Sequence, residues 1–276
     1  LKVAVIYETS PYYAEVAKES PNYVWDPKHE LDQTPPTHEA PPTLGFNPNR
    51  TRISDSLVAE WVPRGFAVVH SESPGTGLSD GSPTCGGDNE ALAPKAVIDW
   101  LNGRARGFTA RDGGDEVKAT WSTGKVGMRG SSYSGSYPIQ TAVGAPKSLV
   151  CISPNANFQS AFDGPPYLGG GLMLAWALSW TTLVDRAMAG RSIATQGFAR
   201  PVDYDRLLQH RPLSTADVAM HGAEVRVYRQ LLAHQTFDGF WAEAQLSVED
   251  YRRITIPALT FTGWYDTTLP GTIANY

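Results

Sequence analysis

The stretch that decides the fold is Lys125-Val126-Gly127-Met128-Arg129-Gly130-Ser131-Ser132-Tyr133-Ser134-Gly135. The short run at 125–128, in which Val126 and Met128 are apolar, predicts a strand, which leads directly into a corner rich in Gly and Ser. A helix of small residues is expected to follow, up to about Gly144. A nucleophile elbow has this order, because it holds a serine on a strained turn between a strand and a helix, with the hydroxyl projecting. Ser132 is therefore the candidate nucleophile.

Small residues surround Ser132, as such a corner requires. Side chains two positions before the serine, and two or three after it, would collide in this geometry, and these positions hold Gly130, Ser134 and Gly135. The strict Gly-x-Ser-x-Gly pattern is not met, because the second glycine comes one position late. The corner alone also fits an ordinary Gly/Ser-rich turn, so the rest of the chain has to distinguish the two.

Strand and helix signals alternate along the chain. Apolar runs predict five strands, and helical spacing predicts two helices before the elbow, with strands at 3–7, 66–70, 125–128, 149–152 and 256–261 and helices at about 54–62 and 90–101. This order favours an α/β fold with a mostly parallel sheet, the α/β-hydrolase fold. We expect a first part of the core at 1–154, with a surface excursion up to about Asn49. A helical cap insertion at 155–250 and a return to the core at 251–276 complete the predicted division.

Two further residues stand where this fold would place the partners of Ser132. The triad of an α/β-hydrolase runs Ser, acid, His along the chain, and Asp266 follows the last predicted strand. An Asp after a glycine is also a common turn residue or cap, so both roles stay open. An oxyanion hole needs donors aimed at the developing charge. The candidates are the backbone N–H of Tyr133 and the phenol of Tyr12, for which a packed tyrosine is the alternative.

Together these segments resemble peptidase family S15, the Xaa-Pro dipeptidyl-peptidases, and their cocaine-esterase-type and α-amino-acid ester hydrolase relatives. The similarity is densest from Ala96 to Gly135, where the Gly-x-Ser-Tyr-x-Gly elbow is the family's own variant. Ser10-Pro11-Tyr12 resembles the segment that carries the oxyanion tyrosine. Gly263-Trp264-Tyr265-Asp266 resembles the segment of the triad aspartate, and 234–241 resembles one at the end of the cap.

The resemblance implies a serine hydrolase that acts through an acyl-enzyme. Ser132 would attack the carbonyl with the help of a histidine base that Asp266 orients. In the family this histidine lies about thirty residues beyond the aspartate, so we expect it beyond Tyr276, outside this chain. None of the six histidines of the chain occupies the expected place.

Peptide and ester substrates both stay open. A peptidase would need a carboxylate to pair with the substrate's amino terminus, and segment 162–171 lacks the family's glutamate, although Asp163 could substitute. The candidate pocket residues are aromatic: Phe162, Trp176, Trp180 and Trp264. Trp176 and Trp180 could equally pack the cap onto the sheet.

The elbow is most similar to the peptidases and the aspartate loop to the esterases. An Xaa-Pro peptidase is favoured, with an ester hydrolase second and a non-catalytic binding module of the same fold third.

The composition and charge of the chain limit the classes of partner that it is expected to bind. The net charge of −5 comes without a basic block, so nucleic acid is not an expected partner. The longest uncharged stretch, 164–184, is broken by Pro and Gly and is too short for a membrane span. No cofactor is expected, because no metal, nucleotide or haem signature appears. A homodimer, the compartment and a bridge between Cys85 and Cys151 stay open.

Overall fold

The computed structural model describes residues 1–11, 55–76, 79–81, 84, 86–110, 112–158, 162, 164–188 and 203–276. Within the helices, only the backbone is described at 55–56 and 182–188. Three residues that the sequence singled out, Tyr12, Cys85 and Asp163, lie outside these ranges. Nearly all of the predicted surface excursion also lies outside them.

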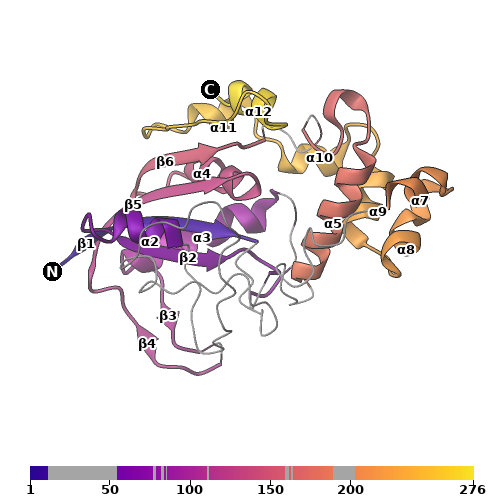
Figure 1. The fold of residues 1–276 in the computed structure, drawn as a ribbon. Helices are drawn as coiled ribbons and strands as arrows, with labels where there is room; N and C mark the ends of the chain where they lie inside the picture. The colour runs from indigo at the N-terminus through magenta and orange to yellow at the C-terminus, as the bar shows by residue number, and fades with distance from the viewer. Residues whose placement is uncertain are drawn as a thin grey trace.

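A parallel sheet forms the centre of the fold (Figure 1). It contains four strands in the order β2-β1-β5-β6, namely β1 (Val3–Ser10), β2 (Ala67–Glu72), β5 (Ser122–Ser131) and β6 (Leu149–Asn155). Tyr7 on β1 lies opposite Val69 on β2 and Met128 on β5. The predicted α/β class is confirmed, and these strands extend beyond the apolar runs that predicted them. The first run ends at Tyr7, whereas β1 continues into Glu8, Thr9 and Ser10, which are polar but buried.

The predicted fifth strand, 256–261, is only partly formed. It lies beside β6, where the N–H of Leu259 donates to the carbonyl of Ile152 and the N–H of Ile152 donates to the carbonyl of Pro257, both at 3.0 Å. A single parallel bridge joins Ile152 and Ala258. Pro257 has no N–H to contribute to a ladder, which accounts for a segment that follows the sheet edge without regular strand pairing.

Two helices cover the face of the sheet on which Tyr7 and Met128 are buried. They are α3 (Asp88–Leu101) and α4 (Tyr133–Val143), and both pack into the main apolar core. The smaller α2 (Asp55–Trp61) contacts β2. A hairpin of β3 (Gly107–Phe108) and β4 (Glu116–Val117) was not predicted, because strands of two residues carry no periodicity.

Helices occupy the chain between β6 and segment 256–261. They are α5 (Leu174–Met188), α7 (Tyr204–Gln209), α8 (Ala216–His221), α9 (Arg226–Ala233), α10 (Gly239–Ala244) and α11 (Val248–Arg252), with short 3-10 turns at 168–170 and 213–215. The last helix is α12 (Leu269–Ala274). Figure 1 shows α5 and α7–α10 beyond the carboxyl ends of the strands. The proposed division of the chain at 154 and 250 stays a prediction. In the described ranges no helix combines the length and hydropathy needed to cross a bilayer.

Candidate active site

Ser132 is the single residue between β5 and α4. Its backbone has φ 61° and ψ −128°, in a region that residues with a side chain rarely adopt, and the residue is exposed. A conformation of this kind costs on the order of 1–3 kcal/mol, and it persists only when the surrounding structure enforces it. The geometry is that of an elbow which pushes one serine out of the turn.

The two glycines beside Ser132 are required by close backbone contacts. A Cβ added at Gly130 would lie 1.9 Å from the carbonyl oxygen of Ser134, and one at Gly135 would lie 2.2 Å from that of Asn155. Neither backbone atom could move away without opening the corner. Position 134 differs, because the Ser134 hydroxyl donates to the Ser10 hydroxyl at 2.8 Å in a buried site. The late second glycine therefore has a steric explanation.

Hydrogen bonds tie the elbow to the carboxyl edge of the sheet. The N–H of Ser132 donates to the carbonyl of Asn155, the last residue of β6, at 3.1 Å. The next residue, Ala156, donates its N–H to the carbonyl of Phe261 at 2.9 Å. The nucleophile candidate and the segment that leads to Asp266 consequently lie at the same edge.

Asp266 forms a turn before α12. Its Oδ1 accepts hydrogen bonds from the N–H and the hydroxyl of Thr268, at 2.8 and 2.7 Å. The turn or capping role that the sequence left open is thus present. Among the described residues, no donor contacts the second oxygen, Oδ2, which leaves that oxygen for a further donor such as an imidazole N–H.

Tyr133 begins α4, and its side chain is buried. Its N–H belongs to the first helical turn, where backbone donors have no acceptor within the helix and attract negative charge. The phenol donates to both oxygens of Glu90 at 3.0 Å. The ring lies 5.6 Å from the Tyr137 ring and 5.9 Å from the Trp180 ring, between centroids.

Glu90 is a buried acid that the sequence did not single out. Burial raises its pKa, while donors such as the N–H of Thr84, the phenol of Tyr133 and the N–H of Gly86 oppose that rise. A signal was available in the sequence, because Glu90 shares the buried face of α3 with Pro94 and Ile98. A charged residue on an apolar helix face needs partners from another element.

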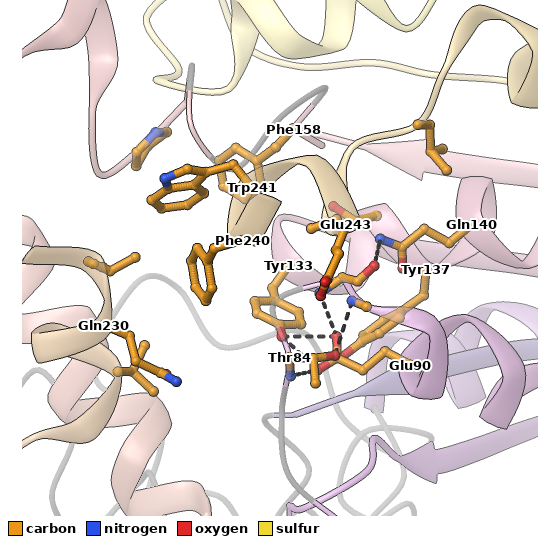
Figure 2. A pocket seen from close by; sticks show the side chains of 18 of the residues that line it. Thr84, Glu90, Tyr133, Tyr137, Gln140, Phe158, Gln230, Phe240, Trp241 and Glu243 are labelled. Carbon is orange, nitrogen blue, oxygen red and sulfur yellow. Dashed lines mark hydrogen bonds between the residues drawn. The ribbon is translucent and has the colours of Figure 1, made fainter. Parts of the chain in front are cut away.

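A cavity of about 830 Å³ opens beside Tyr133. Of the predicted pocket residues, Trp176 and Trp180 line it, whereas Phe162 and Trp264 do not. Phe162 packs instead against Trp241, 5.4 Å between ring centroids, and Trp264 is 86% exposed. The lining also includes residues that the sequence did not indicate: Phe158, Arg226, Gln230, Phe240, Trp241 and Glu243, several of them drawn in Figure 2.

Stacked aromatic rings form one wall of this cavity. Trp176 and Trp180 stack at 5.2 Å with an angle of 12° between their planes, and Trp180 stacks on Tyr133 at 30°. The stack therefore runs from α5 to the first residue after the candidate nucleophile. A cavity of this size and aromatic character suits a small organic substrate. In the described part of the chain, no cluster of three or more His, Cys, Asp or Glu residues could hold a metal ion.

Comparison with known proteins identifies the family. The model of the X-Pro dipeptidyl-peptidase (S15 family) matches residues 1–276. The chain belongs to the S15 family. A relative from Rhodopirellula baltica, named "Putative Xaa-Pro dipeptidyl-peptidase", is 52% identical over 156 residues, which are 56% of this chain and 25% of the relative. A protein of the same name from Bacillus cereus is 42% identical over 175 residues, which are 63% of this chain and 27% of that protein.

Solved structures share the fold of this S15 chain. An aminopeptidase from a marine-sediment Thaumarchaeota archaeon aligns with a TM-score of 0.65 at 15% identity, over 99% of this chain and 41% of its own. An α-amino-acid ester hydrolase aligns with a TM-score of 0.60 at 18% identity, over 94% of this chain and 38% of its own. The family resemblance drawn from the sequence is confirmed. The matched residues span about a quarter of the length of the two curated relatives from Rhodopirellula baltica and Bacillus cereus.

Proposed function

We propose that the protein containing this chain is a serine hydrolase that works through an acyl-enzyme, with the activity of an Xaa-Pro dipeptidyl-peptidase. The observation that carries the proposal is Ser132 at φ 61°, alone between β5 and α4, with glycines at the two positions where a Cβ would clash. Nothing in an ordinary Gly/Ser turn requires this combination. Membership of the S15 family and the names of its relatives support the peptidase assignment.

The proposed reaction has two steps. The Ser132 hydroxyl loses its proton to a histidine base and forms a bond to the substrate carbonyl carbon. The tetrahedral intermediate then collapses, and the leaving amine takes the proton as the C–N bond breaks. In the second step, water attacks the acyl-enzyme, the acid product leaves, and Ser132 regains its proton.

Two groups would stabilise the negative charge on the carbonyl oxygen. The N–H of Tyr133 is the first candidate, because it lies at the N-terminus of α4 directly after Ser132. The phenol of Tyr12 is the second, from the family resemblance. Asp266 would orient the base through Oδ2, while Thr268 holds Oδ1.

The cavity beside Tyr133 is the proposed site for the acyl part of the substrate. Its stacked wall, Trp176-Trp180-Tyr133, suits a compact apolar ring such as the pyrrolidine ring of proline. The same wall favours the second candidate function, hydrolysis of an ester with an aromatic acyl group. Helices between β6 and segment 256–261 supply most of the aromatic lining, in keeping with the proposed cap at 155–250.

Two measurements on the full-length protein test the proposal. A fluorophosphonate should label Ser132, and labelling should disappear in Ser132→Ala. Release of Gly-Pro from a Gly-Pro-anilide should then exceed hydrolysis of a simple aryl ester. Cleavage of the ester alone would replace the peptidase with the esterase, and a folded protein that is never labelled would indicate a non-catalytic binding module.

A further inference from the structure

Glu90 is a fully buried carboxylate beside the elbow, and the proposed reaction gives it no part. It lies in the first turn of α3 and lines the cavity next to Tyr133. Removing a carboxylate from water costs free energy unless hydrogen-bond donors bind its oxygens. The donors around Glu90 therefore indicate what the group does.

Two of these donors come from the loop before α3. The N–H of Thr84 donates to Oε1 at 2.6 Å, and the N–H of Gly86 donates to Oε2 at 3.1 Å. Both bonds fix the carboxylate to backbone, so its position follows the loop rather than a mobile side chain. The carboxylate then presents both oxygens to the Tyr133 phenol at 3.0 Å, as Figure 2 shows.

This arrangement separates Glu90 from a ligand-binding acid. Each oxygen of Glu90 already accepts a backbone N–H, and both share the proton of the Tyr133 phenol, so donors of the protein itself bind the carboxylate. Glu243 differs, because it lines the same cavity but is exposed. Glu90 therefore binds other residues of the protein rather than a ligand. One of these residues, Tyr133, comes immediately after the candidate nucleophile in the chain.

The Tyr133 side chain is held at its tip and on its ring. Glu90 from α3 binds the hydroxyl, and Trp180 from α5 stacks on the ring. The backbone of Tyr133 cannot rotate without moving a ring that is anchored in this way. An oxyanion donor acts only within a narrow distance and angle, so such an anchor has a direct catalytic consequence.

We propose that Glu90 is a positioning residue, whose bond to the Tyr133 phenol keeps the Tyr133 N–H directed at the reacting carbonyl oxygen. The inference rests on the proposed function, since it takes that N–H to be an oxyanion donor. It assigns to α3 a part in transition-state stabilisation, although no atom of α3 touches the substrate's reacting carbon in the proposed reaction.

The decisive variant is Glu90→Gln in the full-length protein. An amide replaces one acceptor oxygen by an NH₂ group, which must then face the N–H of Thr84 or of Gly86. The carboxamide has to turn away, and the Tyr133 phenol loses part of its anchor. We expect kcat on Gly-Pro-anilide and the rate of fluorophosphonate labelling to fall roughly ten- to a hundred-fold, with KM nearly unchanged.

Asp217→Asn is the matched control. Asp217 is also a buried carboxylate that accepts two backbone N–H groups, from Val218 and Val225, but it lies on α8, away from the elbow. This variant should lower the melting temperature while the folded enzyme keeps its kcat. A merely structural role for Glu90 would give the same pattern in Glu90→Gln.

Tyr133→Phe tests the bond from its other end. It should lower kcat by a similar factor. The double variant Glu90→Gln/Tyr133→Phe should be no worse than the poorer single variant, because both substitutions act on the same bond, the one between the Tyr133 phenol and the Glu90 carboxylate. If Glu90→Gln does not fold, an unchanged kcat in Tyr133→Phe overturns the inference. So does a wild-type kcat in folded Glu90→Gln. Failure of the wild type to be labelled would instead overturn the proposed function.

Discussion

The Ser134 hydroxyl donates to the Ser10 hydroxyl at 2.8 Å in a buried site below the nucleophile elbow. Ser10 is the last residue of β1, and Ser134 is the second residue of α4. The bond therefore joins the end of the strand that leads toward Tyr12 to the helix that begins with Tyr133. The two segments proposed to supply the oxyanion donors are linked beneath the reacting position.

We predict that Ser134→Ala destabilises the fold. Its methyl group leaves the buried Ser10 hydroxyl without this partner, which should cost about 1–3 kcal/mol of unfolding free energy. Urea unfolding of Ser134→Ala, Ser10→Ala and the double variant measures it. The double variant should lose less than the sum of the two single variants. Strict additivity would show that the bond contributes nothing.

Alanine at Gly130 or Gly135 should disrupt the elbow. The added Cβ would lie 1.9 or 2.2 Å from a backbone oxygen, so we expect a loss of more than about 3 kcal/mol or failure to fold. Gly239→Ala is the control, because a Cβ there meets nothing within 4 Å. Thermal unfolding and soluble yield report the difference. A Gly130→Ala protein as stable as Gly239→Ala would contradict the elbow geometry.

Removal of Trp180 should weaken substrate binding. Trp180→Ala breaks the stack between Trp176 and Tyr133, so KM for Gly-Pro-anilide should rise several-fold, in line with about 0.5–1.5 kcal/mol for an aromatic contact. Because the Tyr133 ring also loses one of its two anchors, kcat should fall as well. Trp180→Phe should recover part of the loss. Steady-state kinetics measure both, with Tyr204→Ala, an exposed ring on α7, as the control. Equal KM values in all four proteins would place the substrate elsewhere.

Acid should destabilise the protein through His70. Burial, and then the positive charge of Arg129, lower the pKa of His70 from 6.5 to about 4. A histidine with a lowered folded-state pKa stabilises the fold fully above pH 6.5, and this contribution is lost as the pH falls toward 4. The loss is on the order of 3 kcal/mol.

The variant His70→Gln isolates the contribution of His70 to the loss of stability in acid. Urea unfolding between pH 7 and pH 4 should show a smaller fall in stability for His70→Gln than for the wild type. Glu8, which lies opposite His70 on β1 and pairs with Arg129 at 3.6 Å, is the same in both proteins, so the comparison subtracts its contribution. Parallel pH curves for the two proteins would mean that His70 is accessible to water in the folded state.

Much of the fold could be predicted, because the strands that matter are short apolar runs. Segments 3–7 and 125–128 each place two side chains in the main core, Val5 and Tyr7 in one and Val126 and Met128 in the other. Such short runs need no long-range information to be recognised. Segment 256–261 was predicted by the same signal, yet Pro257 and its edge position leave it with one bridge. A local apolar pattern reports burial, whereas regular pairing also requires donors on the neighbouring backbone.

For the candidate site, the sequence by itself indicated Ser132 as the candidate nucleophile, because the small residues around it reflect the lack of space for side chains at such a corner. It also indicated Asp266, which follows the last predicted strand, through the order in which this fold arranges a triad. Only the tertiary structure brought Glu90 to Tyr133, 43 residues away along the chain, and set Trp180 against the same ring. Steric limits at a turn can be recognised from neighbouring residues in the sequence. Contacts between side chains on different helices depend instead on how the sheet and its covering helices pack. That packing also decided that Trp180 lines the cavity while Phe162 and Trp264 do not.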